Sequence, residues 1–268
     1  MNSRDQYIGI FDSGIGGLTV ARSIMEKMPD ENTIYFGDTA HLPYGTKSEK
    51  QIRDFAVNDV TFLNRFSLKA LVIACNTADS VAREVLEEKF DLPIFGVIEP
   101  ASRKAAHETK NNRIGIMATA ATCRSGAYEK QIRKYNAEAE VFAQPCPLLV
   151  PLVENSRYKK DDPVVQIILK EYLAPLTEKE VDTIVLGCTH YPLLMDAICS
   201  IVPQINVISS SQAAADALYE GLSSGGMIRE EKGGEHRYYV SDDAEHFHDN
   251  ALIFMEKQLV GDVEQVSI

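Results

Sequence analysis

Two cysteines lie at the ends of apolar, β-branched runs, at matching places in the two halves of the chain. The apolar run of "LVIACNTADS" (71–80) ends in Cys75, and that of "TIVLGCTHYP" (183–192) ends in Cys188. Small polar residues follow each cysteine, where a helix is expected to begin. The two thiols therefore call for a joint explanation.

Paired thiols at such positions suit proton transfer to and from carbon. Inverting a carbon stereocentre requires a base on one face of the carbon and an acid on the other, with the roles exchanged in the reverse reaction. A free thiol has a pKa near ~8.5, and a helix N-terminus or an adjacent imidazolium lowers it. We therefore expect both thiolate and thiol to be accessible near neutral pH.

Other polar groups also follow predicted strands. In open parallel sheets the ligand crevice lies outside the carboxyl ends of the strands. If two such domains face each other, the two thiols approach one cleft from opposite sides. Helix N-termini and hydroxyl groups can bind carboxylates there, so an acidic amino acid fits the site. The residues concerned are Asp12, Ser13, Asn76, Thr77, Thr119, Thr122, Thr189 and His190.

Simpler roles for these side chains remain open. Asp12, Thr77 and Thr189 could be plain helix N-caps, which is compatible with binding a ligand. Zinc is conceivable at Cys188 and His190, but no further cysteine or histidine lies at ligand spacing, so we predict no metal site. The remaining cysteines, predicted to be small buried hydrophobes, are Cys123, Cys146 and Cys199.

The glycines of "DSGIGGLTV" (12–20) could suggest a dinucleotide site. They do not complete G-x-G-x-x-G, because Thr19 stands at the last glycine position, and no acidic residue follows at a convincing distance. We interpret them as turn and close-packing glycines, and we expect no cofactor.

Short β-branched runs alternate with amphipathic stretches along the chain. "YIGIFD" precedes a predicted helix from about Gly16 to Met28, and "TIYFGD" precedes one from about Ser48 to Phe66. Near the C-terminus, "HRYYVSD" precedes a predicted helix from about Ala244 to Leu259. Such alternation favours parallel sheets built from strand-helix-strand units.

The second half of the chain repeats the first. "IGIF" (8–11) matches "IGIM" (114–117), and "LVIACNT" matches "IVLGCTH" at a similar offset. We predict an α/β fold of two pseudo-symmetric domains with mainly parallel sheets flanked by helices and the active site in the cleft between them. The first domain is predicted to comprise 1–97 and 209–268, because the C-terminal strand and helix should pack back on it, and the second 98–208.

Composition excludes several functional classes. The 268 residues include 45% hydrophobic side chains, as in an ordinary packed core. The N-terminus does not resemble a signal peptide, and no apolar run approaches the ~20 residues of a membrane span, so we expect a cytoplasmic protein. The net charge of −12 disfavours nucleic acid and anionic membranes as partners.

Several segments together resemble the cofactor-independent glutamate racemases of the aspartate/glutamate racemase superfamily. They are "FDSGIGGLTV", "YFGDTAHLPYGTKS", "IACNTA", "GVIEP", "PLVE" and "LGCTHYPLL". The resemblance implies two pseudo-symmetric α/β domains, two catalytic cysteines, no cofactor, and L- and D-glutamate as the small-molecule substrates. It further implies supply of D-glutamate for bacterial peptidoglycan, and a homodimer of undetermined arrangement.

The resemblance also implies roles for individual residues. Cys75 and Cys188 would be the proton-transfer pair, assisted by Asp12 and His190 respectively. Glu154 in "PLVE" would hold the substrate ammonium or orient His190, unless it is a surface carboxylate. The other positions expected to contact substrate are Ser13, Tyr44, Gly45, Asn76, Thr77, Thr119, Thr122 and Thr189.

One position departs from the family pattern. Ala118 stands where the family usually has glycine, and its methyl group could shift Thr119 and Thr122.

Three other functions remain as alternatives. An aspartate racemase is the nearest alternative, although "PYG" and the context of His190 argue against it. A cysteine hydrolase would leave Cys75 unexplained, and a sugar- or amino-acid-binding protein would need neither thiol.

Overall fold

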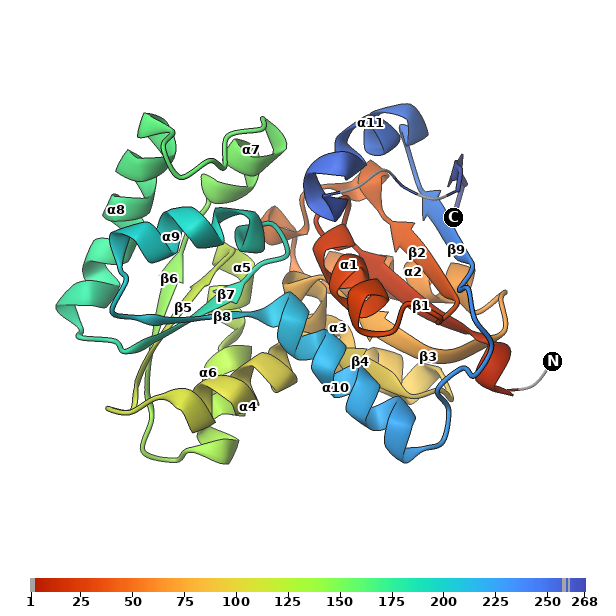
Figure 1. The fold of residues 1–268 in the computed structure, drawn as a ribbon, viewed down its shortest axis with the longest axis horizontal. Helices are drawn as coiled ribbons and strands as arrows, with labels where there is room; N and C mark the ends of the chain where they lie inside the picture. Colours follow the sequence, from red (N-terminus) through yellow and green to blue (C-terminus); the bar gives the residue numbers. More distant parts are fainter. Residues whose placement is uncertain (1–2, 257–258, 260) are drawn as a thin grey trace.

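The computed structural model describes residues 3–256, 259 and 261–268. The described strands form two sheets, one in the order β10-β9-β2-β1-β3-β4 and one in the order β6-β5-β7-β8. Every strand pair is parallel. Figure 1 shows the two sheets in the two halves of the molecule. The strands are β1 Tyr7–Asp12, β2 Thr33–Gly37, β3 Leu68–Ile73, β4 Ile94–Gly96, β5 Arg113–Ala118, β6 Glu140–Pro145, β7 Thr183–Gly187, β8 Asn206–Ser209, β9 His236–Val240 and β10 Val263–Gln265.

The second sheet repeats the topology of the first. The order β2-β1-β3-β4 corresponds strand for strand to β6-β5-β7-β8. The segment that ends in Cys75 therefore occupies the same place in its sheet as the segment that ends in Cys188. The internal repeat predicted from the sequence is confirmed.

The C-terminal segment returns to the first sheet, as predicted. β9 pairs with β2, and β10 extends the sheet beyond β9. The first helix after β4 begins at Ile98, and the first after β8 begins at Ser210. The domain limits at residues 97 and 208 stay a prediction.

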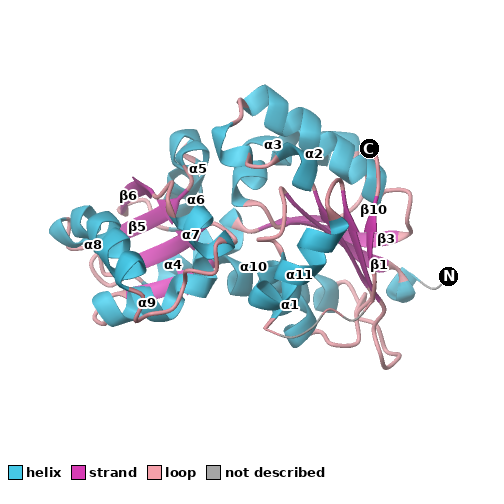
Figure 2. Ribbon diagram, turned by 90° about the horizontal axis from the view of Figure 1, so that it is seen from above, coloured by secondary structure: helices cyan, strands magenta, loops and turns pink. Residues whose placement is uncertain are grey.

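Helices cover both faces of the first sheet (Figure 2). α2 and α3 lie on one face, and α1, α10 and α11 lie on the other. β1 and β2 are buried along their whole length, as expected for parallel strands covered on both faces. The helices are α1 Leu18–Lys27, α2 Glu49–Leu63, α3 Asn76–Lys89, α4 Ile98–Glu108, α5 Ala120–Ser125, α6 Ala127–Tyr135, α7 Leu149–Glu154, α8 Pro163–Glu178, α9 Met195–Ile201, α10 Ser210–Ser224 and α11 Ala244–Met255.

Local sequence signals explain several helix ends. Ser48 and Gln51 form a reciprocal capping box that starts α2. Asp162 accepts hydrogen bonds from the first turn of α8 and precedes a proline at its first position. The last helix ends at Met255 rather than near Leu259, because Glu256 adopts φ 56°. Residues 257 and 258, which the prediction included, lie outside the described residues.

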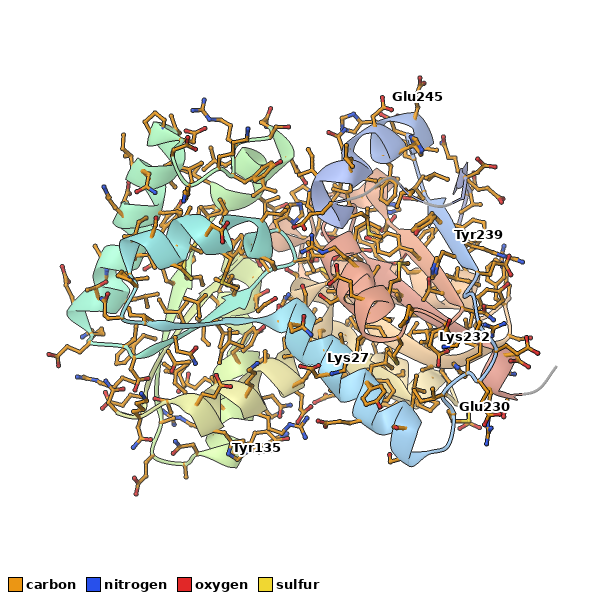
Figure 3. All side chains as sticks on the ribbon, viewed as in Figure 1. Lys27, Tyr135, Glu230, Lys232, Tyr239 and Glu245 are labelled. Atoms are coloured by element: carbon orange, nitrogen blue, oxygen red, sulfur yellow. The ribbon has the colours of Figure 1, made fainter. Side chains whose placement is uncertain are left out.

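The surface is rich in charge. Figure 3 shows the side chains of both halves and labels Lys232 and Glu245 among them. Both are exposed, consistent with the predicted solvated helix and loop faces. None of the described helices is long and apolar enough to cross a membrane.

Candidate active site

The polar residues singled out in the sequence lie at the carboxyl ends of β1, β3, β5 and β7. Asp12 is the last residue of β1, and Cys75 comes two residues after β3. Thr119 follows β5 directly, and Cys188 follows β7 directly. Side chains from the two sheets meet here, so the two strand edges face one another as predicted.

The first thiol caps a helix. Cys75 Sγ accepts a hydrogen bond from the N–H of Ala78 at 3.5 Å, at the start of α3, and lies 3.6 Å from Ser13 Oγ. The side chain is buried. Burial and, after it, the negative charge of Asp12 raise the pKa of the Cys75 thiol to about 12, although the hydrogen bonds with Ala78 and Ser13 oppose the shift.

The second thiol lies beside an imidazole. Cys188 Sγ is 4.0 Å from His190 Nδ1, and both side chains are buried. A short 3-10 helix, Tyr191–Leu194, follows rather than an α-helix. Burial raises the pKa of the Cys188 thiol well above its usual range, and the backbone N–H of His190 lowers it by less.

The prediction of two thiols that ionise near neutrality is wrong for this structure. Burial disfavours each thiolate more than the N–H groups favour it. The negative charges of Asp12 and Glu154 add to this effect at Cys188, and a thiolate at Cys75 would add to it as well. A nearby positive charge is therefore needed to stabilise either thiolate.

His190 is held on three sides. Its Nε2 lies 3.0 Å from Glu154 Oε1, and its ring packs edge-on against Phe254 of α11 with centroids 5.3 Å apart. Gly16 completes the enclosure, because a Cβ there would lie only 2.4 Å from the imidazole and from Thr189 Oγ1. The interpretation of Gly16 as a close-packing glycine is confirmed.

Asp12 lies at the centre of the site. Its Oδ2 accepts the N–H of Gly14 at 3.0 Å, whereas its buried Oδ1 has no hydrogen-bond partner. Burial raises the pKa of Asp12, while the charge of His190 and the N–H groups of Gly17 and Gly14 lower it. An unpaired buried carboxylate oxygen is costly, so this atom is available to a donor on a ligand.

Three threonine hydroxyls meet across the two halves. Thr77 Oγ1 lies 3.0 Å from Thr119 Oγ1 and 3.2 Å from Thr122 Oγ1, and Thr119 lies 3.0 Å from Thr122. Ala118 pairs with Gly187, which has no side chain to collide with the methyl group. Thr119 caps α5 normally by accepting the N–H of Thr122.

The tyrosine hydroxyl of the "PYG" loop is bound to two buried carboxylates. The hydroxyl of Tyr44 donates to Asp38 at 2.6 Å and to Asp59 at 3.0 Å, inside the first half. Gly45 lies against Thr119, since a Cβ there would be 3.2 Å from the threonine Cβ. Any contact of Tyr44 with a substrate would therefore come from its backbone.

Comparisons with known proteins agree with this site. Residues 18–218 match the family described as Asp/Glu/hydantoin racemase. The chain is 43% identical over 263 residues to a glutamate racemase of Geobacter metallireducens, a match that covers 97% of this chain and 96% of that protein. The chain belongs to the glutamate racemase family.

Solved structures of the glutamate racemase family share this fold. One from Bacillus anthracis has a TM-score of 0.94 at 36% identity and covers 99% of this chain and 98% of its own. One from Francisella tularensis, in complex with D-glutamate, has a TM-score of 0.91 at 36% identity, with 98% of each chain covered. The predicted family, α/β fold class and isomerase activity are confirmed.

Some residues of this glutamate racemase family member were not identified from its sequence. The buried carboxylates of Asp38 and Asp59 that hold Tyr44 are one example. Asp38 directly follows β2, so the rule used for the other strand ends would have found it. Asp59 and Tyr128 lie inside helices and carry no such signal.

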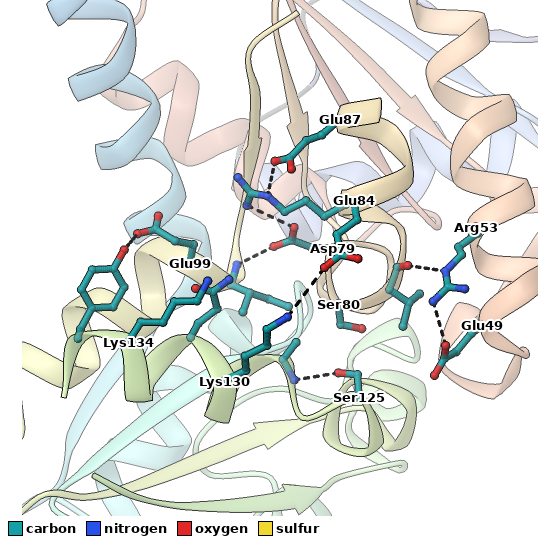
Figure 4. A pocket seen from close by; sticks show the side chains of 16 residues that line it. Glu49, Arg53, Asp79, Ser80, Glu84, Glu87, Glu99, Ser125, Lys130 and Lys134 are labelled. Carbon is teal, nitrogen blue, oxygen red and sulfur yellow. Dashed lines mark hydrogen bonds and ion pairs between the residues drawn. The ribbon is translucent and has the colours of Figure 1, made fainter. Parts of the chain in front are cut away.

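Two cavities of the described structure are lined by neither thiol. A groove of about 640 Å³ between α3 and α6 is lined by charged side chains, among them Arg83, Glu84 and Lys130 (Figure 4). A cavity of about 260 Å³ is lined by Leu42, Glu154 and residues of α11. Within the described part of the chain, no three His, Cys, Asp or Glu side chains form a group that could hold a metal ion.

Proposed function

We propose that this chain interconverts L- and D-glutamate by moving the α-proton between Cys75 and Cys188. The observation that carries the proposal is the arrangement of two buried thiols at equivalent strand ends of two repeated sheets, whose strand-end side chains contact one another. A base and an acid on opposite sides of a carbon are what inversion by proton transfer requires. The resemblance in sequence and fold to glutamate racemases supports the same activity.

In the direction from L-glutamate, the Cys188 thiolate removes the α-proton. The electron pair of the broken C–H bond stays on the α-carbon, and the Cys75 thiol then gives its proton to the opposite face. The reaction leaves Cys188 as a thiol and Cys75 as a thiolate, which is the state that accepts D-glutamate. Return to the first state takes place through proton exchange or through the reverse reaction.

The substrate would supply the charge that the thiols lack. A substrate ammonium group placed in the cleft would donate to the unpaired Oδ1 of Asp12 and stabilise an adjacent thiolate. A thiolate formed in so buried a site is poorly solvated and is therefore a strong base toward carbon. Asp12 would assist Cys75, to which it is electrostatically coupled, and His190 would assist Cys188.

The substrate carboxylates would bind the hydroxyl cluster and the adjoining helix starts. Thr77 in the first turn of α3 and Thr119 at the N-cap of α5 face each other, so backbone N–H groups and hydroxyls converge. Glu154 would orient His190, with which it shares a hydrogen bond. The remaining groups proposed to contact the substrate are Ser13, Tyr44, Gly45, Asn76, Thr122, Thr189 and His190.

Isotope labelling tests the proposal directly. L-Glutamate incubated in D₂O without added cofactor should yield D-glutamate that carries deuterium at the α-carbon, while the L-glutamate recovered at low conversion carries almost none. Each thiol holds a single proton, so the proton removed is not the one delivered. Comparable early deuterium in both enantiomers would contradict the paired thiols.

The same assay tests the alternative functions. L-Aspartate under the same conditions tests the aspartate racemase alternative. The absence of any α-proton exchange would favour a hydrolase or a binding protein.

The remaining proposals concern the cell. D-Glutamate made here would enter peptidoglycan synthesis, as the family resemblance implies. The five cysteines are free thiols, which suits a cytoplasmic location. A homodimer is proposed from the family resemblance, and sedimentation of the purified chain measures it.

A further inference from the structure

Tyr128 contacts the segments that carry both thiols. It is the second residue of α6, in the second half, and is 3% exposed. Its hydroxyl donates to Asn76 Oδ1 at 2.6 Å. Asn76 directly follows Cys75, so the contact reaches from one half of the molecule to the first thiol of the other.

The ring of Tyr128 lies against the second thiol-bearing strand. A Cβ placed on Gly187 would lie 2.9 Å from Tyr128 Cε2, so the aromatic edge occupies the space beside this glycine. Gly187 directly precedes Cys188. One side chain thus touches the residue after the first thiol and the residue before the second.

A second path of hydrogen bonds joins the same segments. Asn76 Nδ2 lies 3.5 Å from Ser210 Oγ, which donates to the carbonyl of Leu186 at 2.8 Å. Leu186 is the neighbour of Gly187 on β7. Both ends of the Asn76 amide are therefore engaged, which defines its orientation between the two halves.

We propose that Tyr128 is a positioning residue for the proton transfer, holding Asn76 and the start of α3 at a set distance from the strand end that carries Cys188. The inference rests on the two-thiol function proposed above. Proton transfer is sensitive to small displacements of the reacting groups, so a tie between the two segments acts on the rate without touching the substrate.

The two contacts of Tyr128 can be separated. Tyr128→Phe deletes the hydroxyl that holds the Cys75 side and keeps the ring on the Cys188 side. The change leaves a buried amide oxygen of Asn76 without a donor, and we expect kcat to fall about tenfold while the fold is retained.

The decisive measurement is the isotope effect on each direction. Enantiomers have equal free energies, so kcat/KM must change equally in both directions. When the Cys75 side alone is slowed, removal of the label from D-[α-²H]glutamate becomes more rate-limiting and its isotope effect on kcat/KM rises. The isotope effect with L-[α-²H]glutamate falls. His190→Asn, which acts on the other thiol, should shift the two isotope effects in the opposite sense.

Two further variants provide controls. Tyr7→Phe removes a hydroxyl that donates to Glu235 at the far end of β1 and should alter neither isotope effect. Adding Tyr128→Phe to Asn76→Ala should lower kcat no further, since Tyr128 acts through Asn76.

Three results would overturn the assignment of Tyr128. They are unchanged turnover in Tyr128→Phe, a loss of kcat with both isotope effects unchanged, and additive losses in the double variant. Failure of the two-thiol function would be seen separately, as racemisation by Cys75→Ser or Cys188→Ser.

Discussion

Glu154 Oε1 lies 3.0 Å from His190 Nε2, on the side of the imidazole opposite Cys188. This carboxylate sets the orientation of the ring, so that the opposite nitrogen, Nδ1, faces Cys188. His190 therefore belongs to the environment of Cys188 and not to that of Cys75. Its replacement should affect the two proton transfers unequally.

Replacing His190 by asparagine should slow proton transfer at Cys188 alone. The isotope effect on kcat/KM should rise for L-[α-²H]glutamate, whose label Cys188 removes, and fall for the D-enantiomer. Glu154→Gln should shift both isotope effects in the same sense but by less, because the imidazole remains. Isotope effects in His190→Asn that are unchanged from the wild type would count against this assignment.

Replacing either thiol should abolish racemisation. In Cys75→Ser or Cys188→Ser, a hydroxyl is too weak an acid to supply an alkoxide base near neutral pH, and we expect activity to fall by roughly 10²–10⁴ or more. Chiral chromatography of the products measures the loss, and circular dichroism checks the fold. Cys199→Ser is the matched control, since Cys199 lies outside the cleft on α9 and should be dispensable. Wild-type turnover in either site variant would remove that cysteine from the mechanism.

Stability should depend on pH through Cys75. Its thiol has a pKa of about 12 when folded against a usual value of 9.0, so the folded protein holds the proton more tightly. The resulting stabilisation is fully present below pH 9 and is lost as the pH rises toward 12, by about 1.4 kcal/mol per pH unit from this group. Urea unfolding of the wild type and of Cys75→Ser at pH 8, 9 and 10 measures the difference. Parallel pH profiles would contradict the prediction.

Gly16→Ala should disturb the site although Gly16 itself transfers no proton. The added methyl would lie 2.4 Å from the imidazole of His190, so His190 or the loop must move. We expect a loss of about 1–3 kcal/mol in the free energy of unfolding together with lower kcat. Gly225→Ala is the control, because a Cβ there makes only an ordinary contact at 3.4 Å. Similar results from both variants would mean that the enclosure of His190 is looser than this geometry implies.

Full activity is expected after dialysis against a chelator. The proposed chemistry assigns both proton-transfer roles to thiols, so neither metal nor pyridoxal phosphate has a step to perform. Racemisation is measured before and after exhaustive dialysis, with and without added pyridoxal phosphate or zinc. Activity that returns only with an additive would overturn the prediction.

The strand ends and their chemistry could be predicted from the amino-acid sequence. Cys75 and Cys188 follow β-branched apolar runs, and such runs are visible in sequence because buried parallel strands require them at every position. The repeat of these runs also predicted two related domains, and their sheets share one strand order. The strand ends could be predicted because each is encoded by a short segment of consecutive residues.

The environment of each group was decided by tertiary packing. The sequence placed Cys75 at a helix start, but whether the N–H groups or burial control its pKa depends on how closely residues distant in the sequence pack around it. Tyr44 was placed in the right loop, yet its hydroxyl is bound to Asp38 and to Asp59 of α2. Tyr128 reaches Asn76 only because the two halves pack together, and no spacing along the chain encodes a contact between residues brought together by folding.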